Sequence, residues 1–374
     1  MKGIITQKNF KKSLNIVEKI ASKRLSLPIL ENILIETEKS FLKLSSTNLE
    51  IGVLCWILAK IEKPGKFLLP GKFLNNFINL LPEDIIEFNV NENKNLNFTC
   101  KDYKAEIKGF DVNEFPIIPK YKGIDFIEID NLSFIKELKN VIAIASDSQD
   151  QTVISGIYIL FSKDFIELVA TDSFRLIKKI ISLDKENRKQ QSVIIPKKTA
   201  TEIVSILDNF QEKIKIYISP TQILFEVLTG DLSQPQVNIV SRLIEGEYPN
   251  YKEIIPIKAR TRIIASKEEI IRQIKIVGLF CKEDGSIKMK INQKHGIIDF
   301  FSQEVDTGQG HSRIKVETDG EDAEVLFNYK FLIDGITRTK GSKVVFELSG
   351  QDKPGVFKSI EDKNYIYLIM PIKE

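Results

Sequence analysis

The sequence is poor in the residues that most often serve as metal ligands and nucleophiles. Only two of its 374 residues are histidine and three are cysteine. His295 and His311 have no second nitrogen or sulfur ligand at the spacing of a metal motif. Cys55, Cys100 and Cys281 lie far apart among apolar residues, which favours core thiols over a disulfide or metal framework. We therefore predict that the protein binds no metal and no cofactor.

Long apolar runs are missing as well. No run reaches the roughly 18 residues that a membrane-spanning helix requires, and the N-terminus has no secretory apolar segment. We expect a cytoplasmic protein without a membrane partner. An excess of one charge is also absent, because 54 Lys and Arg residues oppose 51 Asp and Glu residues, for a net charge of +3. The net charge therefore does not predict whether the protein binds nucleic acid, and the placement of the basic residues matters instead.

Stretches that could suggest an enzyme are incomplete. Residues 65–73 have one residue too many between the glycines of a phosphate-binding loop, so a turn before a helix is expected there. Gly308 and Gly310 lack the third glycine of a dinucleotide fingerprint and also predict a turn. Acidic clusters at 147–150 and 319–322 have no adjacent base, and short acidic loops are usually solvated. We predict no catalytic site, with an enzyme of nucleic-acid metabolism as an open alternative.

The chain does contain a threefold repeat. The stretch 168–176, an apolar strand end that runs into a Thr-Asp-Ser turn, matches the earlier stretch 42–50. An amphipathic helical pattern precedes each stretch and occurs a third time near 270. The apolar positions of the three helices are Phe10, Leu14, Val17 and Ala21; Phe134, Leu138, Val141 and Ala145; and Ile270, Ile274, Val277 and Cys281.

A second helix and an alternating strand complete each copy. The second helices are expected at 69–81, 195–207 and 327–336, and the first two have a proline at their second position, which a first helical turn tolerates. The alternating strands follow at 86–90, 214–218 and 344–348. Three divergent copies of a unit of about 125 residues fill the chain. We predict an α+β protein of three tandem helix-strand domains with boundaries 1–122, 123–252 and 253–374.

Several short motifs in a fixed order resemble one known family. They lie at 27–32, 170–176, 193–197, 246–249 and 367–371. Their order and spacing along the whole chain are similar to those of the bacterial DNA polymerase III beta subunits, the DNA sliding clamps. The resemblance implies a DNA clamp fold in which two chains join head to tail as a homodimer, a six-domain ring around double-stranded DNA. Such a clamp is a polymerase processivity factor without chemistry of its own.

The same resemblance implies several protein partners. An ATP-dependent clamp loader would place the ring on DNA. The ring would then tether the DNA polymerase III catalytic subunit, other DNA polymerases and repair proteins through short peptides. A monomeric peptide-binding scaffold built from the same repeats is the second alternative, and it would need neither a basic lining nor a dimeric mass.

Basic residues recur on the helices that would face DNA. The first helix carries Lys8, Lys11, Lys12 and Lys19, and the later helices repeat the pattern. Contacts from lysine to phosphate are independent of base sequence and weaken with salt, which suits a sliding protein. By family position the expected DNA contacts are Arg24, Lys72, Gln149, Lys197 and Lys198.

Family clamps bind partner peptides in an apolar groove between the second and third domains. Aliphatic, proline and methionine side chains suit a peptide that is anchored by a few apolar residues. By resemblance, the groove would be lined by Ile154, Thr171, Ser173, Phe174, Arg175, Leu176, Pro249, Ile254, Pro354, Leu368, Met370, Pro371 and Ile372. Ser173 and Phe174 stand where Gly-His is common, and Glu253 where a basic residue is frequent. A more apolar and more negative rim is therefore expected.

The dimer contact is expected between two edge strands, one at 103–108 and one near 310–314. Its apolar residues would be Ala105 and Ile107 on one side and Leu279 and Phe280 on the other. An unpaired edge invites association, so closure of the ring would satisfy both strands. Many relatives carry acidic residues on the third-domain strand, whereas this chain carries His311 and Arg313. Weaker charge pairing across the contact is therefore expected.

Overall fold

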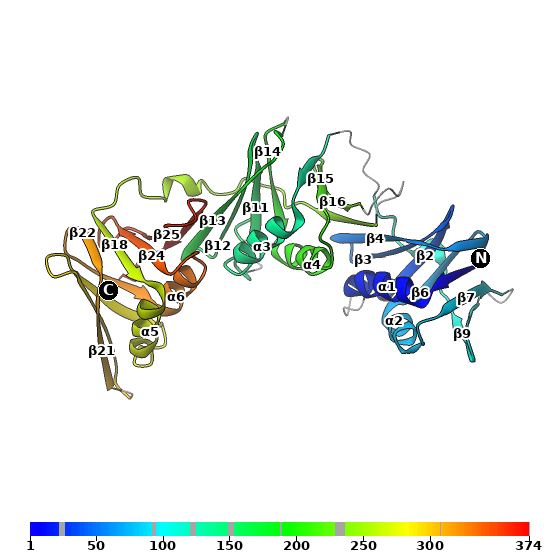
Figure 1. Cartoon of the computed structure of the whole chain (residues 1–374), viewed down its shortest axis with the longest axis horizontal. Helices are drawn as coiled ribbons and strands as arrows, with labels where there is room; N and C mark the ends of the chain where they lie inside the picture. Colours follow the sequence, from blue (N-terminus) through cyan, green and yellow to red (C-terminus); the bar gives the residue numbers. More distant parts are fainter. Residues whose placement is uncertain are drawn as a thin grey trace. The chain divides into compact units, whose positions relative to one another are not determined.

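The computed structural model describes eight stretches of the chain. They are residues 1–21, 27–91, 95–119, 125–148, 153–187, 189–228, 236–306 and 308–373. Two compact units are present, unit 1 (Met1–Ile135 and Lys198–Leu243) and unit 2 (Lys136–Lys197 and Ile244–Glu374), and each is described by itself. Figure 1 labels their helices and strands. None of the helices in the described stretches is long and apolar enough to cross a membrane.

Unit 1 contains the first repeat and part of the second. Its elements are β1 (Lys2–Thr6), α1 (Gln7–Ala21), η1 (Pro28–Glu31), β2 (Asn32–Glu38), β3 (Phe41–Thr47), β4 (Ile51–Leu58), β5 (Lys60–Lys63), β6 (Lys66–Pro70), α2 (Gly71–Leu80), β7 (Ile85–Val90), β8 (Asn95–Cys100), β9 (Tyr103–Lys108), η2 (Val112–Glu114), β10 (Ile127–Ile129), β15 (Ile214–Ile218), β16 (Gln222–Val227) and β17 (Val237–Arg242). Helices α3 (Asn131–Ile142) and α4 (Lys197–Leu207) contain the points of division between the units, after Ile135 and after Lys197.

Unit 2 contains the rest of the second repeat and the third. Its elements are β11 (Gly156–Phe161), β12 (Phe165–Thr171), β13 (Arg175–Ser182), β14 (Gln191–Pro196), η3 (Tyr251–Glu253), β18 (Thr261–Ser266), α5 (Lys267–Gly278), β19 (Ser286–Asn292), β20 (Ile297–Glu304), β21 (Gly308–Lys315), β22 (Glu317–Gly320), β23 (Ala323–Asn328), α6 (Tyr329–Thr337), β24 (Lys343–Leu348), β25 (Gly355–Ser359) and β26 (Tyr365–Ile369).

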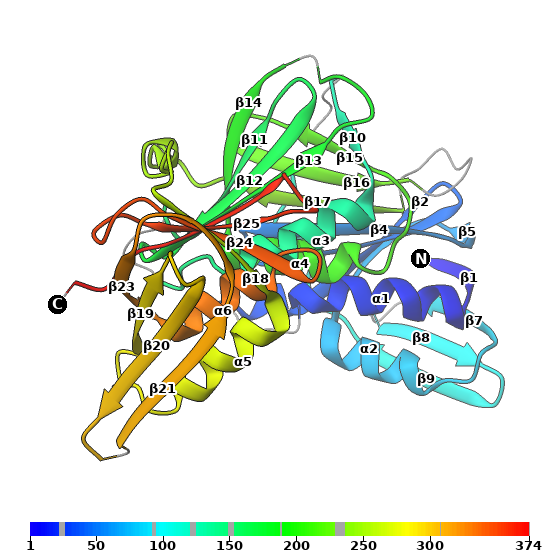
Figure 2. The same ribbon diagram turned by 60° about the vertical axis from the view of Figure 1, so that its left-hand side comes forward.

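Each unit contains two antiparallel sheets. In unit 1 the strand orders are β5-β1-β7-β8-β9 and β10-β15-β16-β17-β4-β3-β2-β6, and in unit 2 they are β14-β11-β12-β13-β26-β25-β24-β18-β22 and β21-β20-β19-β23. The long sheet of unit 1 joins the first repeat to the second through β4 and β17. The long sheet of unit 2 joins the second repeat to the third through β13 and β26. Figure 2 shows β21 at the margin of the four-stranded sheet, with α5 along one face.

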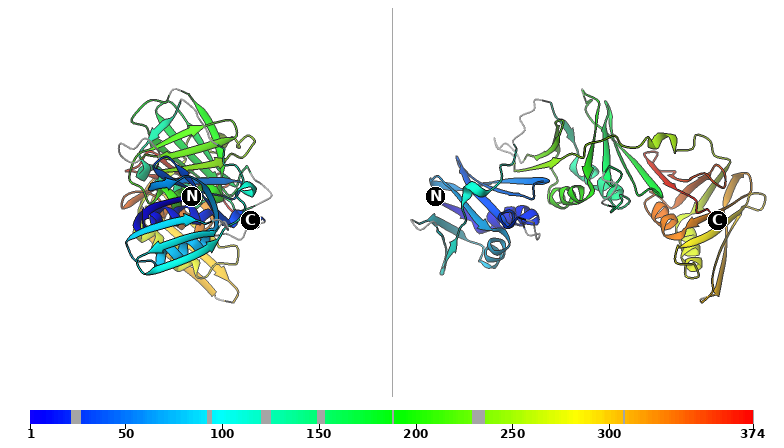
Figure 3. Two further views of the ribbon diagram at one scale, coloured as in Figure 1. Left: turned by 90° about the vertical axis from the view of Figure 1, so that its right-hand side faces the viewer. Right: turned by 180° about the vertical axis from the view of Figure 1, so that it is seen from behind.

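The predicted helices are confirmed by their buried stripes. In α1, Phe10, Leu14 and Val17 are at most 1% exposed, as a helix with apolar residues three and four positions apart requires. Helices α1 and α2 lie side by side (Figure 3). The second and third apolar patterns are partly wrong, because each extends past its helix. Helix α3 ends at Ile142, before the buried Ala145, and α5 ends at Gly278, before the half-buried Cys281. Core thiols are confirmed for Cys55 and Cys100 alone.

Both turns predicted around glycines are wrong. Residues 66–70 form strand β6, which runs straight into α2 at Gly71. Gly308 and Gly310 lie in β21, although Gly308 has a φ of +97°, a conformation that glycine tolerates best. Glycine spacing suggested turns, but pairing with β20 holds this stretch extended. The edge strand expected at 103–108 is confirmed as β9.

The first residue of each repeat's first helix has one shared structural role. Its side chain donates hydrogen bonds to two carbonyl groups in the last turn of the second helix of the same repeat or just beyond it, which would otherwise lack partners. The donors are Gln7 Nε2 to Ile78 (2.8 Å) and Leu81 (3.2 Å), Asn131 Nδ2 to Leu207 (2.9 Å) and Phe210 (2.7 Å), and Lys267 Nζ to Thr337 (2.8 Å) and Thr339 (2.7 Å). Burial lowers the pKa of Lys267. Three different side chains therefore tie the helices of three repeats in the same way.

Candidate DNA and partner interfaces

The similarity between residues 42–50 and 168–176 has a structural basis, because both end in the same turn. Thr171 Oγ1 donates to the carbonyl of Arg175 (2.7 Å) and accepts from the N–H of Ser173 (3.1 Å). Thr47 Oγ1 repeats both bonds, to Ile51 at 2.9 Å and from Leu49 at 3.1 Å. The third residue of each turn has a positive φ, 76° at Ser173 and 74° at Leu49. Each turn delivers the chain directly into the strand that joins two repeats.

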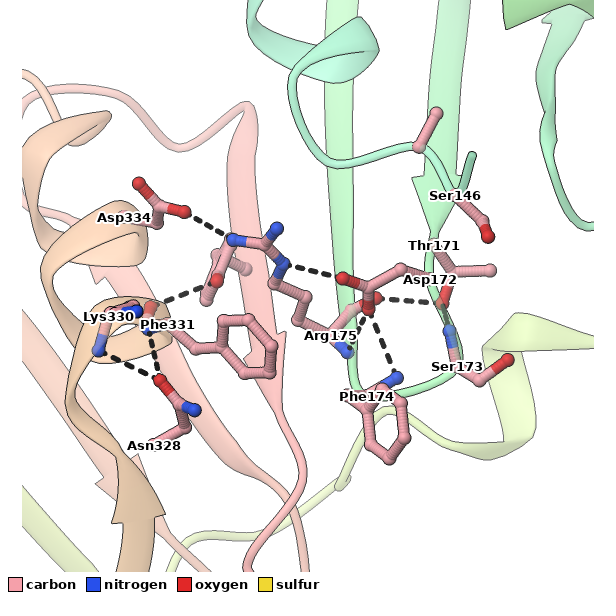
Figure 4. A network of polar contacts seen from close by, with 12 residues as sticks. Ser146, Thr171, Asp172, Ser173, Phe174, Arg175, Asn328, Lys330, Phe331 and Asp334 are labelled. Carbon is pink, nitrogen blue, oxygen red and sulfur yellow. Dashed lines mark hydrogen bonds and ion pairs between the residues drawn. The ribbon is translucent and has the colours of Figure 1, made fainter. Parts of the chain in front are cut away.

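Arg175 lies at the centre of a polar network in unit 2 (Figure 4). Its Nε lies 2.8 Å from Asp172 Oδ2, its Nη1 pairs with Asp334 of α6, and its guanidinium lies 4.3 Å from the centre of the Phe331 ring. Its side chain is only 15% exposed. Burial opposes the charge, but the hydrogen bond to Asp172 and the surrounding negative charges outweigh it and raise the pKa of Arg175. The side chain therefore fixes the turn of the second repeat to a helix of the third.

The expected groove residues divide into an exposed set and a buried set. Phe174, Ile254 and Met370 are exposed by 63%, 45% and 38%. Leu176 and Leu368 are buried and pair across β13 and β26, where they form a cluster with Val169, Tyr251 and Val356. Pro354 is also buried, Ser173 and Pro249 are exposed, and Ile154, Thr171, Arg175, Pro371 and Ile372 are half-buried.

The C-terminal segment is held at two points near this turn. The N–H of Met370 donates to the carbonyl of Phe174 (2.8 Å), and the N–H of Ile372 donates to the carbonyl of Leu326 in β23 (2.9 Å). A pocket of about 560 Å³ adjoins the segment and is lined by Lys288, Glu324, Val325, Leu326, Gln351, Asp352, Ile372 and Lys373. Unit 2 therefore brings the turn 171–175 and residues 370–372 together, as the groove hypothesis requires.

Tyrosines fix the segment before β18 to the sheet beneath it. The Tyr251 hydroxyl donates to Glu167, whose carboxylate also lies 3.2 Å from Lys178 Nζ. Burial and this contact with Glu167 raise the pKa of Tyr251 above its ordinary value. The Tyr248 and Tyr158 rings stack with centres 5.1 Å apart. This arrangement positions Pro249 and Ile254. The groove residues expected from the sequence included none of these tyrosines, although Tyr248 lies in the 246–249 motif, and they included neither Asp334 nor Phe331.

The expected DNA contacts have different surroundings. Lys72 and Lys198 are exposed in the first turns of α2 and α4. Lys197 is half-buried, and its Nζ donates to the Ala145 carbonyl (2.7 Å) and to Asp147 Oδ1 (2.6 Å). Arg24 and Gln149 lie outside the described residues.

The basic face expected on α1 needs one correction. Lys19 Nζ donates to the carbonyl (2.6 Å) and the hydroxyl (2.9 Å) of Ser205 in α4, and burial lowers the pKa of Lys19. Lys12 Nζ lies 5.6 Å from the centre of the Phe210 ring. These two residues therefore serve contacts within unit 1, whereas Lys8 remains exposed and Lys11 is half-buried.

The two strands expected at the dimer contact carry apolar residues beside them. Leu279 is 75% exposed and Phe280 is half-buried, whereas Ile107 is buried within its own unit and Ala105 is half-buried. On β21, His311 Nε2 and Arg313 Nε lie 2.8 and 2.7 Å from Asp299 Oδ1. The hydrogen bond from Arg313 contributes most to lowering the pKa of Asp299.

Acidic, histidine and cysteine side chains do not converge as they would at a metal centre. Within the stretches that the structure describes, no group of three or more His, Cys, Asp or Glu residues is arranged to hold a metal ion.

Comparisons with known proteins match the whole chain. Three family models, the N-terminal, central and C-terminal domains of the DNA polymerase III beta subunit, match residues 1–119, 128–250 and 252–373. The beta sliding clamp of Staphylococcus aureus is 27% identical over 390 residues, and that of Synechocystis 24% over 395, each match covering 100% of this chain and 99% of the relative. The crystal structure of the Bacillus subtilis DNA polymerase sliding clamp is 24% identical with a TM-score of 0.92, covering 100% of this chain and 99% of that one. A putative DNA polymerase III beta subunit from Eubacterium rectale is 26% identical with a TM-score of 0.91, covering 100% of both chains.

Proposed function

This chain belongs to the DNA polymerase III beta subunit family, and from that premise we propose that two copies close head to tail around duplex DNA. It has the three-domain DNA clamp fold and is a DNA sliding clamp, a processivity factor for a DNA polymerase. The family is an accessory one rather than a catalytic one. We also propose domain boundaries at 1–122, 123–252 and 253–374, the absence of a catalytic site, and a place in the cytoplasm.

The way in which the repeats join supports ring closure. Each internal joint connects two four-stranded segments of a long sheet and is formed by the last strand of each segment. One segment has the order β6-β2-β3-β4 in unit 1 and β14-β11-β12-β13 in unit 2. The other has the order β10-β15-β16-β17 in unit 1 and β18-β24-β25-β26 in unit 2. The two joints are β4 with β17 and β13 with β26. The equivalent strands left over are β21, which pairs with β20, and β9, which pairs with β8. They lie at the two ends of the chain's own series, so a second copy can supply the missing partner for each, which makes a homodimer with two identical joints.

Sequence-independent binding to DNA is supported by the exposed lysines at the helix starts. Lys72 and Lys198 occupy equivalent places in α2 and α4 and present charge without any base-reading geometry. Lys197 would act beside them, and Arg24 and Gln149 complete the proposed set. Many weak phosphate contacts allow a closed ring to slide, because no single contact specifies a position.

Peptide binding is supported by the exposed apolar residues of unit 2. Phe174, Ile254 and Met370 are more exposed than core residues of their type, and the turn and C-terminal segment that carry two of them are hydrogen-bonded together. We propose this as the groove for short peptides of the DNA polymerase III catalytic subunit, the clamp loader, other polymerases and repair proteins. The ATP-dependent loader would open the ring and place it on DNA.

Retention on circular DNA tests the function directly. The protein would be loaded onto nicked circular DNA with a compatible loader and ATP, and the circle would then be cut open. We expect retention on the circle and rapid loss from the linear form, because a ring slides off free ends. Equal retention on both forms would mean attachment to the DNA surface and would favour a scaffold that does not encircle DNA. Magnesium-dependent turnover of the DNA would instead favour an enzyme.

A further inference from the structure

The two internal joints of the chain use the same strand register. In each repeat, the third residue before a helix lies in a strand, and its cross-strand partners define a row of residues that runs across the sheet. From the residues before the second helices, Leu68, Ile194 and Leu326, the partners lead across each sheet to Leu54, Lys178 and His311. From the residues before the first helices, Ile4, Glu128 and Ile264, they lead to Lys104, Asn238 and Ile366.

The equivalent residues meet in both joints. Leu54 is paired with Asn238 between β4 and β17, and Lys178 is paired with Ile366 between β13 and β26. The terminal hydrogen bonds also coincide. Arg242 N–H donates to the Glu50 carbonyl (2.9 Å) as Met370 N–H does to that of Phe174 (2.8 Å). At the other end, the N–H groups of Trp56 and Ile180 each donate at 3.1 Å to the carbonyls of Gln236 and Asn364.

We propose that β21 of one chain pairs with β9 of a second copy in this same register, with His311 opposite Lys104. The proposal rests on the head-to-tail dimer proposed above and specifies its residue contacts. Antiparallel pairing then places Ser312 opposite Tyr103, Gly310 opposite Ala105 and Arg313 opposite Asp102. By equivalence with the internal joints, the N–H of Arg313 donates to the carbonyl of Asp102.

The burial patterns of the two strands agree with this register. Along β21, Gly310, Ser312 and Ile314 are buried and the residues between them are exposed. Along β9, Ala105 and Ile107 are the less exposed positions and Lys104 and Glu106 are exposed. The register places Gly310, Ser312 and Ile314 on the same face as Tyr103, Ala105 and Ile107, and pairing would cover Tyr103, which is 57% exposed in the single chain. A slip by one residue would set this face of β21 against the opposite face of β9, because side chains alternate between the faces of a sheet.

Side-chain size and charge fit as well. A Cβ atom at Gly310 would lie 2.6 Å from the Phe280 ring, so the ring already fills the space beside that position. Ala105, the residue opposite, is small and leaves room for the half-buried ring. On the other face, Arg313 meets Asp102, an opposite-charge pair of the kind that stabilises neighbouring strands.

Disulfide trapping tests the register. Ser312→Cys combined with Tyr103→Cys places two cysteines at a non-hydrogen-bonded pair, where Cα atoms lie about 4.5 Å apart, within the range of about 4.4–6.8 Å for a disulfide. The matched control combines Ser312→Cys with Ala105→Cys, a diagonal pair about 7–8 Å apart on the same face. We expect mild oxidation to give a covalent dimer at least tenfold faster for the first pair than for the second. The Ser312→Cys variant alone shows how much cross-linking involves Cys281, a native cysteine that is only half-buried.

The outcomes separate this inference from the proposed function. Sedimentation of each reduced variant and of the native chain first establishes whether a dimer forms. A dimer that cross-links through 103 and 312 supports the register. A dimer that cross-links faster through 105 and 312, or through neither pair, overturns the register while the dimer itself stands. If the native chain is monomeric, the proposed ring fails, and the register fails with it.

Discussion

At the residue scale, the turn before each joining strand places a non-glycine residue in a left-handed conformation. Ser173 and Leu49 have φ values of 76° and 74°, which cost a side chain with a Cβ atom about 1–2 kcal/mol. The Thr171 and Asp172 side chains hold the turn by accepting the N–H groups of Ser173, Phe174 and Arg175. Glycine, which the family resemblance led us to expect at Ser173, would remove this strain.

Ser173→Gly is therefore expected to stabilise the protein. The relief of strain exceeds the extra entropy that glycine brings to the unfolded chain, so the free energy of unfolding should rise by about 0.5–1 kcal/mol. Urea unfolding followed by circular dichroism measures the change. Ser40→Gly, in an exposed turn without a positive φ, is the matched control and should be neutral or destabilising. A loss of stability in Ser173→Gly alone would show that its hydroxyl matters more than its backbone.

Phe174 belongs to the same turn, and we propose that its side chain binds partner peptides. It is 63% exposed, so its removal should hardly change folding. Phe174→Ala is expected to weaken binding of a polymerase-derived peptide about tenfold, the effect of losing roughly half of a buried aromatic contact. Fluorescence anisotropy with a labelled peptide measures the affinity. Ile257→Ala removes a side chain that is 98% exposed and outside the proposed groove, and it should bind as the native protein does. Equal affinities for all three proteins would place the groove elsewhere.

At the scale of elements, the two internal joints differ in chemistry although they share a register. The β4–β17 joint pairs Cys55 with Val237, both buried. At the equivalent place, the β13–β26 joint pairs Lys179 with Tyr365. Lys179 is 2% exposed, and its Nζ lies 2.8 Å from Asp362 Oδ2 and 3.1 Å from Glu137 Oε2. Burial alone would raise the pKa of Asp362, but the hydrogen bond from Lys179 outweighs it and lowers that pKa.

Lys179→Met should destabilise unit 2 strongly at neutral pH. It leaves two buried carboxylates with less positive charge, a change that costs about 3–5 kcal/mol when a buried pair is broken. Because the native pKa of Asp362 is depressed, its stabilising effect is present above the unfolded pKa of about 4 and is lost as the pH falls through the native value. The gap between variant and native protein should therefore shrink as Asp362 protonates.

Thermal unfolding at pH 7 and at about pH 3, below the unfolded pKa of an aspartate, measures this gap. Lys163→Met removes an exposed ion pair with Glu186 and should leave stability nearly unchanged at both values. If Lys179→Met were as stable as Lys163→Met at pH 7, the buried network would contribute little to the joint.

At the scale of the whole molecule, the proposed ring depends on a joint that one chain cannot complete. Leu279, at 75% exposure, and the half-buried Phe280 adjoin β21, and an apolar surface of this kind beside a free strand edge is suited to association. The same edge carries His311 and Arg313, both bound to Asp299. Dimer affinity therefore depends on backbone pairing between the strands, on burial of apolar side chains and on the charged residues of the exposed face of β21.

Leu279→Asp together with Phe280→Asp should convert the dimer to monomers, because two carboxylates would have to lose their hydration in place of two apolar side chains at the contact. Analytical ultracentrifugation at micromolar concentration measures the mass. Ile257→Asp with Lys258→Asp, exposed residues away from β21, is the matched control and should remain dimeric. A dimer that persists in the first variant would place the interface at other residues.

The sequence alone determined the three repeats, the α+β class, the family and the edge strand β9, because periodicity, turn residues and motif order are local properties that repetition reinforces. It could not determine which side chains meet across distant strands. Three contacts join residues that are far apart in the chain. They are the ion pair between Arg175 and Asp334, the ion pair between Lys179 and Asp362, and the hydrogen bond from Lys19 to Ser205. The spacing of the glycines also predicted a turn at Gly308, where pairing with β20 holds the chain in a strand instead. Only the tertiary structure decides these features, because strand register, not local pattern, sets which groups come within reach of one another.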